Sequence, residues 1–315
     1  MIFGLNDLEV LKQNDSYEFN EYVKRPLNTK CYMSIVATNK CQKKCPYCIN
    51  SHTDCTSELD LDKALPNIKA AHEKLGINEC VILGGEPTLH TQIVRLVNEL
   101  HKMNFSKVVM TTNGVDLTDE LLEQLLNAGL THLNVSVHND MGEHCTIGLN
   151  KMRHIYETAK RVNPNVPVRI NTNVWKGNHD TLDGLIDWLT LLQPMSDTIR
   201  VSNLIKKDGF SVNPENNEQT FDMMHTDEYY NELFDGVINH YAKNYSLINN
   251  PSALGFVDYT MIPTKSAIII NRNIDSKVAE QVCENEETKI NTVKCLINGE
   301  LSLSWNTNNI FTLKD

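Results

Sequence analysis

The sequence predicts an α/β fold in which six parallel strands alternate with helices. Three observations support this prediction. Short apolar runs recur from residue 31 onward, amphipathic stretches separate them, and several runs carry polar residues on one face only. Strands that alternate with helices form parallel βαβ units with right-handed crossovers. The order alone is compatible with an open doubly wound sheet and with a complete or partial barrel.

The elements of this core follow one another in a regular order. The six expected strands are short apolar runs at Tyr32–Val36, Cys80–Leu83, Lys107–Met110, His132–Val137, Val168–Asn173 and Thr198–Val201. The five expected helices have apolar residues at helical spacing, at Leu61–Leu75, Gln92–Lys102, Asp119–Ala128, Asn150–Val162 and Asp180–Leu192. Thr118 is a typical N-cap before the third helix, and Gly129 is a typical end signal after it.

The sequence flanking this core has a different character. Residues 1–30 are polar without a strong period and are expected to form an N-terminal arm before a core at residues 31–205. Residues 206–315 are expected to form a helix and a β-rich cap, a β-containing C-terminal extension over the open side of the core. The elements expected there are a polar loop, a helix, two strands and a hairpin turn, at Lys206–Thr226, Asp227–Asn244, Ala267–Ile270, Leu296–Trp305 and Asn298-Gly299.

Composition limits the classes of function. The chain has 315 residues, of which 41% are hydrophobic, enough for a sizeable core. A net charge of −11 argues against an extended nucleic-acid groove, which needs clustered Lys and Arg. No apolar run approaches about 18 residues, and no signal peptide is visible, so no membrane span and a cytoplasmic location are expected. In that reducing compartment nine cysteines are more often ligands, catalytic thiols or buried residues than disulfides.

Three cysteines, Cys41, Cys45 and Cys48, lie in one loop-like segment that reads Cys-Gln-Lys-Lys-Cys-Pro-Tyr-Cys. Iron–sulfur clusters are usually held by four Cys thiolates, so three thiolates leave one metal position open to another ligand. An open position is also what a catalytic metal needs. The alternative is a zinc site whose fourth ligand is His52 or Cys55.

Three of the expected strands are polar on one face and apolar on the other. Because side chains alternate along a strand, each polar set points the same way. Buried polar groups without partners are costly, so these faces are predicted to line a wet interior that holds a ligand. A structural hydrogen-bond network is the alternative. The polar sets are Asn134, Ser136 and His138; Arg169, Asn171 and Asn173; and Thr198, Arg200 and Ser202.

Two turn motifs end the second and third expected strands. In Leu83-Gly84-Gly85-Glu86-Pro87-Thr88, the glycines allow a ligand to approach the backbone closely. The Glu86 carboxylate or nearby carbonyls can accept hydrogen bonds from an ammonium group, although a tight turn with Glu86 near a helix start is the alternative. Thr111-Thr112-Asn113-Gly114 is also a common turn. Ligands gather at the carboxyl ends of parallel strands, where both motifs fall.

The spacing C-x3-C-x2-C, with an aromatic residue before the last Cys and Gly-Gly-Glu-Pro about forty residues later, resembles the radical S-adenosylmethionine (radical SAM) superfamily. The resemblance spans roughly residues 31–205 and implies a partial (β/α)6 barrel. It implies that Cys41, Cys45 and Cys48 hold a [4Fe–4S] cluster whose fourth iron binds SAM. The cluster then cleaves SAM reductively to a 5′-deoxyadenosyl radical, which abstracts hydrogen from a substrate. A reductant such as flavodoxin or ferredoxin is the expected partner.

The resemblance also implies roles for residues at the strand ends. Tyr47 matches an aromatic residue that lies beside the adenine of SAM, and Gly84, Gly85, Glu86 and Pro87 match a stretch that binds its amino group. The looser matches to ribose, carboxylate and adenine contacts, together with a further candidate SAM contact from the Asn-Gly turn, are Ser136, Asn171, Asn173, Ser202, Asn203, Leu204 and Asn113.

The substrate is not encoded in these motifs. Four cations placed near the cavity mouth favour a small anionic or nucleotide-like substrate, namely Arg169, Arg200, Lys176 and Lys206. The alternatives are surface charges with no such role, a maturase that modifies a peptide or protein, and a non-catalytic zinc-binding module. The arm of 30 residues is short for a peptide-recognition domain, which weakens the maturase alternative.

Four of the six cysteines outside the C-x3-C-x2-C motif, and one histidine, are further candidates for a role at the site. Cys283 and Cys295 are too few for a second cluster without distant help from Cys145 or Cys55. Cys145 and His138 are the candidate catalytic residues, and a buried structural role is the alternative for each.

Overall fold

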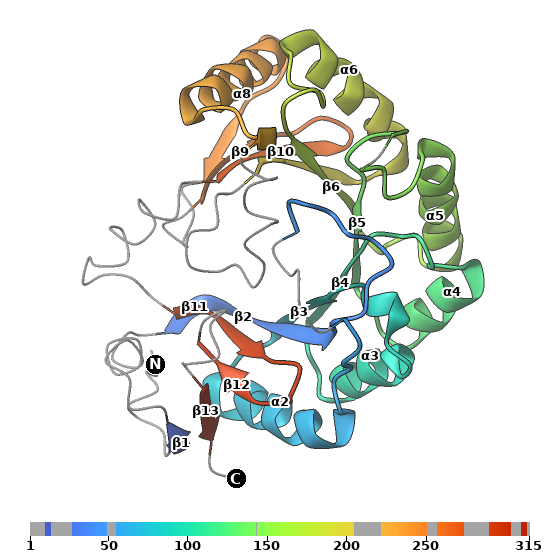
Figure 1. Cartoon of the computed structure of the whole chain (residues 1–315), viewed down its shortest axis with the longest axis vertical. Coiled ribbons are helices and arrows are strands. Elements are labelled where there is room, and N and C mark those ends of the chain that lie inside the picture. The colour runs from blue at the N-terminus through green and yellow to red at the C-terminus, as the bar shows by residue number, and fades with distance from the viewer. Residues whose placement is uncertain are drawn as a thin grey trace.

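The computed structural model describes residues 10–13, 27–48, 55–142, 144–204, 222–250, 257–273, 290–303 and 310–313. Within these ranges the strands form one sheet of 13 strands, in the order β1-β13-β12-β11-β2-β3-β4-β5-β6-β7-β10-β9-β8. The sheet curves, and helices cover its convex side (Figure 1). Its two ends, β1 and β8, do not pair with each other. The predicted α/β class and partial barrel are therefore confirmed.

All six expected strands are present and lie next to one another in chain order, each parallel to the next. Because parallel strands end on the same side, this arrangement brings the residues that follow each strand to one edge of the sheet. The six strands are β2 (Leu27–Thr38), β3 (Glu79–Gly84), β4 (Lys107–Thr112), β5 (His132–Ser136), β6 (Val168–Val174) and β7 (Thr198–Asn203).

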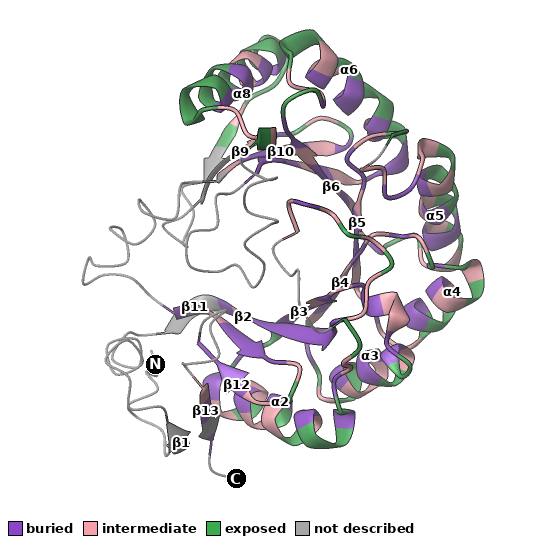
Figure 2. Cartoon of the chain, in the orientation of Figure 1, coloured by how far each residue is buried: buried purple, intermediate pink, exposed green. Residues whose placement is uncertain are grey.

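The expected helices are also present, and two short 3-10 helices accompany them. The predicted N-cap is confirmed, since the Thr118 side chain accepts a hydrogen bond from the Leu121 N–H. Figure 2 shows that the helices bury the side facing the sheet and expose the other. The helices are α2 (Leu61–Leu75), α3 (Ile93–Lys102), α4 (Asp119–Asn127), α5 (Leu149–Val162), α6 (Leu182–Leu192), α8 (Asp227–Ala242), η2 (Pro87–Leu89) and η3 (Gln193–Met195).

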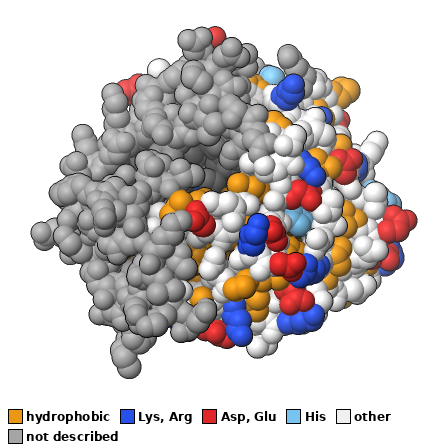
Figure 3. Space-filling model, turned by 60° about the horizontal axis from the view of Figure 1, so that its bottom comes forward, with side chains coloured by type: hydrophobic (Ala, Val, Ile, Leu, Met, Phe, Trp, Pro, Cys, Tyr) orange, Lys and Arg blue, Asp and Glu red, His pale blue; other side chains and the backbone are white. Residues whose placement is uncertain are grey.

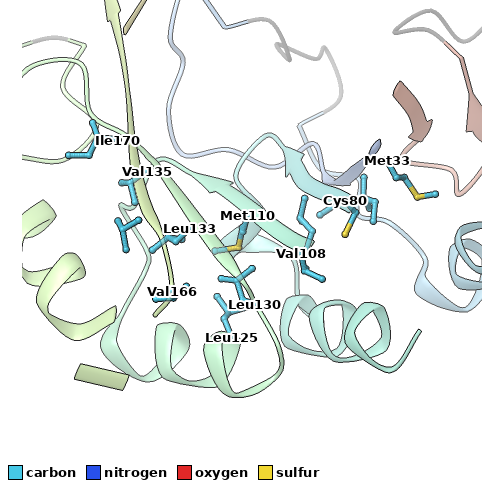
Figure 4. Packing of buried hydrophobic residues seen from close by; sticks show 14 of the residues in the cluster. Met33, Cys80, Val108, Met110, Leu125, Leu130, Leu133, Val135, Val166 and Ile170 are labelled. Carbon is cyan, nitrogen blue, oxygen red and sulfur yellow. The ribbon is translucent and has the colours of Figure 1, made fainter. Parts of the chain in front are cut away.

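The hydrophobic core lies between the sheet and these helices (Figure 4). Met33, Cys80, Met110, Leu133 and Ile170 come from five neighbouring strands and are all fully buried. Burial of one large apolar side chain contributes about 1.5–3 kcal/mol, so this layer fixes the strand faces strongly. The alternate residues of the same strands point to the concave side, as the polar sets in the sequence predicted.

The C-terminal extension adds strands to both edges of the core sheet. β10 (Ala267–Asn273) pairs in parallel with β7, and β11 (Ile290–Cys295) pairs in parallel with β2. The described strands of this segment thus lengthen the sheet, whereas the sequence suggested a cover over the open side. The division into an arm, a core and a cap stays a prediction, although β2 already begins at Leu27. The outer strands are β9 (Val257–Ile262), β8 (Ile248–Asn250), β12 (Leu301–Ser302), β13 (Ile310–Leu313) and β1 (Val10–Gln13).

One expected strand, Leu296–Trp305, is wrong. β11 ends at Cys295, and a turn separates it from β12. The turn at Asn298-Gly299 is confirmed, since the Gly299 N–H donates to the Leu296 carbonyl at 2.8 Å and Gly299 has a φ of 83°. The apolar pattern runs on through Leu296 into the turn, which explains the error. Most of the expected loop Lys206–Thr226 lies outside the described residues.

None of the described helices combines the length and the apolar character needed to cross a bilayer. On the face shown in Figure 3, side chains of Lys and Arg intermingle with those of Asp and Glu over the described part.

Candidate active site

The cysteine loop, residues 39–48, leaves the end of β2 and crosses the carboxyl ends of the neighbouring strands (Figure 1). Cys41, Cys45 and Cys48 are all half-buried in it. The Cys48 N–H donates to the Cys45 carbonyl at 3.1 Å, which closes a tight turn. The Lys43 N–H donates to the Cys41 sulfur at 3.4 Å. Burial raises the pKa of the Cys41 and Cys45 thiols, so a bound cation is needed to favour the thiolates.

The first turn motif holds this loop through its backbone. The Gly85 N–H donates to the Thr38 carbonyl at 2.6 Å, and the Glu86 N–H donates to the Lys40 carbonyl at 2.7 Å. A Cβ atom on Gly84 would overlap the Thr38 carbonyl, and one on Gly85 would overlap the Lys40 carbonyl. The sequence assigned these glycines to a close approach by a ligand. In the structure the close partner is the chain that leads into the cysteine loop.

This packing predicts a defect for Gly85→Ala. The added methyl group must push away the Lys40 carbonyl, which we expect to cost about 1–3 kcal/mol of stability and to displace the cysteine loop. Iron and sulfide incorporation, measured beside a urea unfolding curve, should fall. The matched control is Gly76→Ala, where nothing lies within 4 Å of the added Cβ and only the φ of 68° is strained. Normal iron incorporation by Gly85→Ala would contradict this role.

The carboxylate of Glu86 is buried, and it is fully occupied by neighbours within the protein. It accepts hydrogen bonds from the Thr88 N–H at 3.1 Å, the Thr88 hydroxyl at 2.8 Å, the Thr112 hydroxyl at 2.5 Å and the Asn113 N–H at 2.7 Å. Burial raises the pKa of Glu86, and these donors act against that shift. Glu86 therefore ties the ends of β3 and β4 together. Of the two acceptors predicted for the SAM amino group, the backbone carbonyls of Gly84–Pro87 are therefore favoured over the Glu86 carboxylate.

Asn113 connects the second turn motif to the cysteine loop. Its side-chain amide nitrogen lies 3.9 Å from the Cys41 sulfur and 3.3 Å from the Gln42 side-chain oxygen. Gln42 in turn donates to the Asp116 carboxylate at 2.7 Å. Asn113 thus lies beside a predicted iron ligand, and a contact with SAM stays a prediction.

The end of β5 lies against the cysteine loop as well. His138 is buried, and its ring contacts Tyr47 edge-on at 5.4 Å between centroids. Burial lowers the pKa of His138 to about 4, so the ring is neutral near pH 7. The Asn173 N–H donates to its Nδ1 at 3.1 Å, which assigns the proton to Nε2. These contacts describe a structural role, and catalysis by His138 stays an untested prediction.

Cys145 follows β5 and also meets the cysteine loop. Its carbonyl accepts a hydrogen bond from the Lys43 ammonium at 2.9 Å. Its thiol donates to the carbonyls of Asp140 at 3.3 Å and Asn139 at 3.5 Å, and burial raises its pKa. The Cys145 thiol therefore lies beside the cysteine loop, in the protonated form that hydrogen-atom donation requires. Cys295, by contrast, is fully buried in the core, and burial raises its pKa to about 12.

Polar residues of β6 face the concave side, as predicted. Asn171 has a side-chain oxygen that is buried and has no hydrogen-bond partner among the described residues. The same holds for the Arg169 Nε atom. Buried polar atoms are rarely left without partners, so these atoms mark where a ligand is expected. Ser136, at the end of β5, pairs in register with Asn171.

The looser candidates at the end of β7 are oriented differently. Ser202, Asn203 and Leu204 are all buried. The Ser202 hydroxyl accepts a hydrogen bond from the Asn271 amide on β10 at 3.1 Å, and the Asn203 amide donates to the Leu204 carbonyl at 3.3 Å. The first of these bonds joins β7 to β10, and the adenine contact predicted for this strand end stays a prediction.

One residue at the site, Trp175, was missed by the sequence analysis. It directly follows β6 and stacks on Tyr47, with ring centroids 5.1 Å apart. An aromatic residue just after a strand that carries polar interior residues was the available signal. The predicted cations differ in placement. Arg169 is the second residue of β6 and Arg200 the third of β7, so both lie on the concave face toward the amino ends of these strands, and the predicted place near the cavity mouth is wrong for them. Lys176 is exposed, and Lys206, like Cys283 and His52, lies outside the described residues.

Comparison with models of protein families matches residues 35–189 to the radical SAM superfamily. The chain belongs to the radical SAM superfamily. Membership confirms the predicted enzyme class and its cofactors, a [4Fe–4S] cluster and SAM. The match does not support the alternative of a non-catalytic zinc module.

Individual relatives agree with this assignment. A GTP 3′,8-cyclase of Clostridium botulinum is 30% identical over 176 residues, covering 52% of this chain and 54% of the relative. The chain spans about half the length of the curated relatives it matches. Among solved structures, Streptococcus suis SuiB bound to its precursor peptide SuiA has a TM-score of 0.61 at 13% identity, covering 87% of this chain and 60% of SuiB. HemN of Escherichia coli, a coproporphyrinogen III oxidase, has a TM-score of 0.50 at 13% identity, covering 90% and 67%. At these identities the two structures support the fold alone.

The residues present fit the cofactors of a radical SAM enzyme. Three half-buried thiols share one loop, and N–H groups of Lys43 and Asn113 approach the Cys41 sulfur, as hydrogen bonds to cluster ligands do. Within the described ranges no three His, Cys, Asp or Glu side chains converge on one metal ion. When bound, the cluster and SAM supply one-electron cleavage chemistry, and the protein supplies binding and orientation.

Proposed function

We propose that this protein reductively cleaves SAM at a [4Fe–4S] cluster held by Cys41, Cys45 and Cys48, and that the resulting radical takes hydrogen from a small anionic, nucleotide-like substrate. The observation that carries the substrate class is a pair of arginines on the concave face. The same proposal assigns SAM contacts to Tyr47 and to the Gly84–Pro87 backbone.

Arg169 and Arg200 lie on adjacent strands and face the same side of the sheet. Asn171, on the face of Arg169, pairs in register with Arg200. Burial, and after it the neighbouring Arg200 guanidinium, lowers the pKa of Arg169 to about 10, and burial lowers the pKa of Arg200. An arginine guanidinium keeps its proton in proteins, so both side chains are cations.

No acidic side chain among the described residues forms an ion pair with either arginine. Two neighbouring half-buried cations repel each other and have lost part of their water, so an anion between them lowers the free energy of both. A phosphate or carboxylate group of a substrate meets this requirement, since guanidinium groups bind both with paired hydrogen bonds. Relatives named GTP 3′,8-cyclases act on a nucleotide, which supports the nucleotide class here.

A deuterium-transfer assay tests the proposal. Anaerobic protein, reconstituted with iron and sulfide, is given a chemical reductant, SAM and deuterated candidates: GTP, ATP, a phosphosugar and a dicarboxylate. We expect 5′-deoxyadenosine to form and to acquire deuterium from one of these anions. Flavodoxin or ferredoxin should replace the chemical reductant. Deoxyadenosine that acquires deuterium only from peptides would instead identify a maturase and refute the substrate class.

A further inference from the structure

Four aromatic rings surround the last turn of the cysteine loop. Tyr47, between Cys45 and Cys48, stacks on Trp175 with centroids 5.1 Å apart and planes inclined by 29°. His138 contacts both rings edge-on, at 5.4 Å from Tyr47 and 5.9 Å from Trp175. His144 does the same at 6.2 Å and 6.0 Å. We call these four residues the aromatic cage. Stacked and edge-to-face pairs at these distances attract beyond the area that they bury.

Trp175 is itself held firmly, so it is the fixed member of the stack. It is only 5% exposed. Its backbone exchanges hydrogen bonds with Asn178, at 2.9 Å and 3.4 Å, across a turn in which Gly177 has a φ of 80°. The side-chain amide of Asn178 donates to the His138 carbonyl at 3.0 Å and the Asn173 carbonyl at 3.3 Å. The turn is therefore anchored to the ends of both β5 and β6.

Tyr47 lies in the turn between Cys45 and Cys48. The Cys48 N–H to Cys45 carbonyl bond closes the turn but does not attach it to the sheet. The stack on Trp175 does attach it, because Trp175 belongs to the turn that follows β6. One face of the tyrosine ring is thereby covered.

We propose that Trp175 is a positioning residue for the SAM site. By stacking on Tyr47 it fixes the turn between Cys45 and Cys48 at the carboxyl ends of β5 and β6, so that the tyrosine ring is already in place when SAM binds. The inference rests on the proposed function, since the contact between Tyr47 and SAM is part of it. Preorganisation of this kind raises affinity by removing the cost of ordering a loop during binding.

The test compares Trp175→Leu, which removes the ring, with Trp175→Phe, which keeps one. In the anaerobic holoprotein, SAM binding is followed by the change that it causes in the electron paramagnetic resonance spectrum of the reduced cluster. We expect the SAM dissociation constant to rise about tenfold in Trp175→Leu and to stay within about threefold of wild type in Trp175→Phe. The KM for SAM should rise similarly, while kcat at saturating SAM changes little.

A second measurement uses metal-free protein. Alkylation of Cys45 and Cys48 by iodoacetamide, followed by mass spectrometry, should be faster in Trp175→Leu, because the turn is no longer held on the sheet. The matched control is Trp188→Leu. Trp188, on α6, is 3% exposed and stacks on His179 with ring centroids 4.3 Å apart. The Trp188→Leu variant therefore loses a buried indole comparable to that of Trp175. It should leave both readouts unchanged.

The outcomes separate this inference from the proposed function. Wild-type SAM affinity and alkylation rates in Trp175→Leu would overturn the inference and leave the proposed function standing. A reconstituted wild type that does not respond to SAM would overturn the proposed function, while alkylation still decides whether Trp175 holds the loop. Should Trp175→Leu not fold, Asn178→Ala removes the anchor of Trp175, and it should shift both readouts in the same direction; unchanged readouts in it would reject the inference.

Discussion

Replacement of Cys45 by alanine is expected to abolish SAM cleavage, by at least roughly a thousandfold, or about 4 kcal/mol of barrier. Two thiolates then face a cluster that needs three, and the turn that carries Cys48 loses its metal anchor. Stability should change little, since Cys45 is half-buried on a loop and contributes nothing to the hydrophobic core. Iron and sulfide content, deoxyadenosine formation and a thermal melt measure the three effects.

Cys55→Ser is the matched control for this variant. Cys55 is exposed and lies in the same part of the chain, and it was one candidate fourth ligand of a zinc site. A cluster with a position open to SAM predicts that Cys55→Ser retains iron, sulfide and SAM cleavage. A closed zinc site predicts the loss of one metal ion in both variants. Deoxyadenosine formation by Cys45→Ala at the wild-type rate would contradict the ligand assignment.

The core of the fold was predictable because its signals are local. The six strands from Tyr32 to Asn203 each carry an apolar face against helices and are separated by helical periodicity. The sequence did not predict that β10 pairs with β7 or that β11 pairs with β2. An apolar run such as Ala267–Ile270 indicates a strand, but it carries no information about which distant strand is its partner. Pairing of this kind depends on the closure of long loops and on tertiary packing.

The site was predictable in its ligands and less so in its supports. The spacing of the three cysteines, Cys41, Cys45 and Cys48, identifies them as ligands. Trp175 lies more than a hundred residues further along the chain and contacts Tyr47 only in the folded protein. The sequence gives Gly85 and Glu86 the right place, but it does not reveal that the glycine packs on the Lys40 carbonyl or that four donors occupy the carboxylate. The hydrogen-bond partner of a buried polar group depends on which strands lie next to each other in the fold.

Arg169→Met is expected to move stability and substrate affinity in opposite directions. Removing a half-buried cation that has no ion-pair partner among the described residues removes a desolvation cost and the repulsion from Arg200. Methionine fills a similar volume, so the substrate-free protein should gain about 1–3 kcal/mol in a urea unfolding curve. The anionic substrate loses a charge-assisted bond, so its KM should rise about 10- to 100-fold.

SAM cleavage in the absence of substrate should be unchanged, because Arg169 lies near the amino end of β6, away from the strand ends where the cysteine loop lies, and is not among the proposed SAM contacts. Lys176→Met is the control, since Lys176 is exposed and immediately follows Trp175 on the same loop. It should alter neither stability nor KM. A structural arginine would give the opposite pair of results, with stability lost and KM retained. A gain in stability together with a rise in KM therefore separates an arginine that binds substrate from an arginine that stabilises the fold. Removing a group that stabilises the folded chain does not raise the stability of that chain.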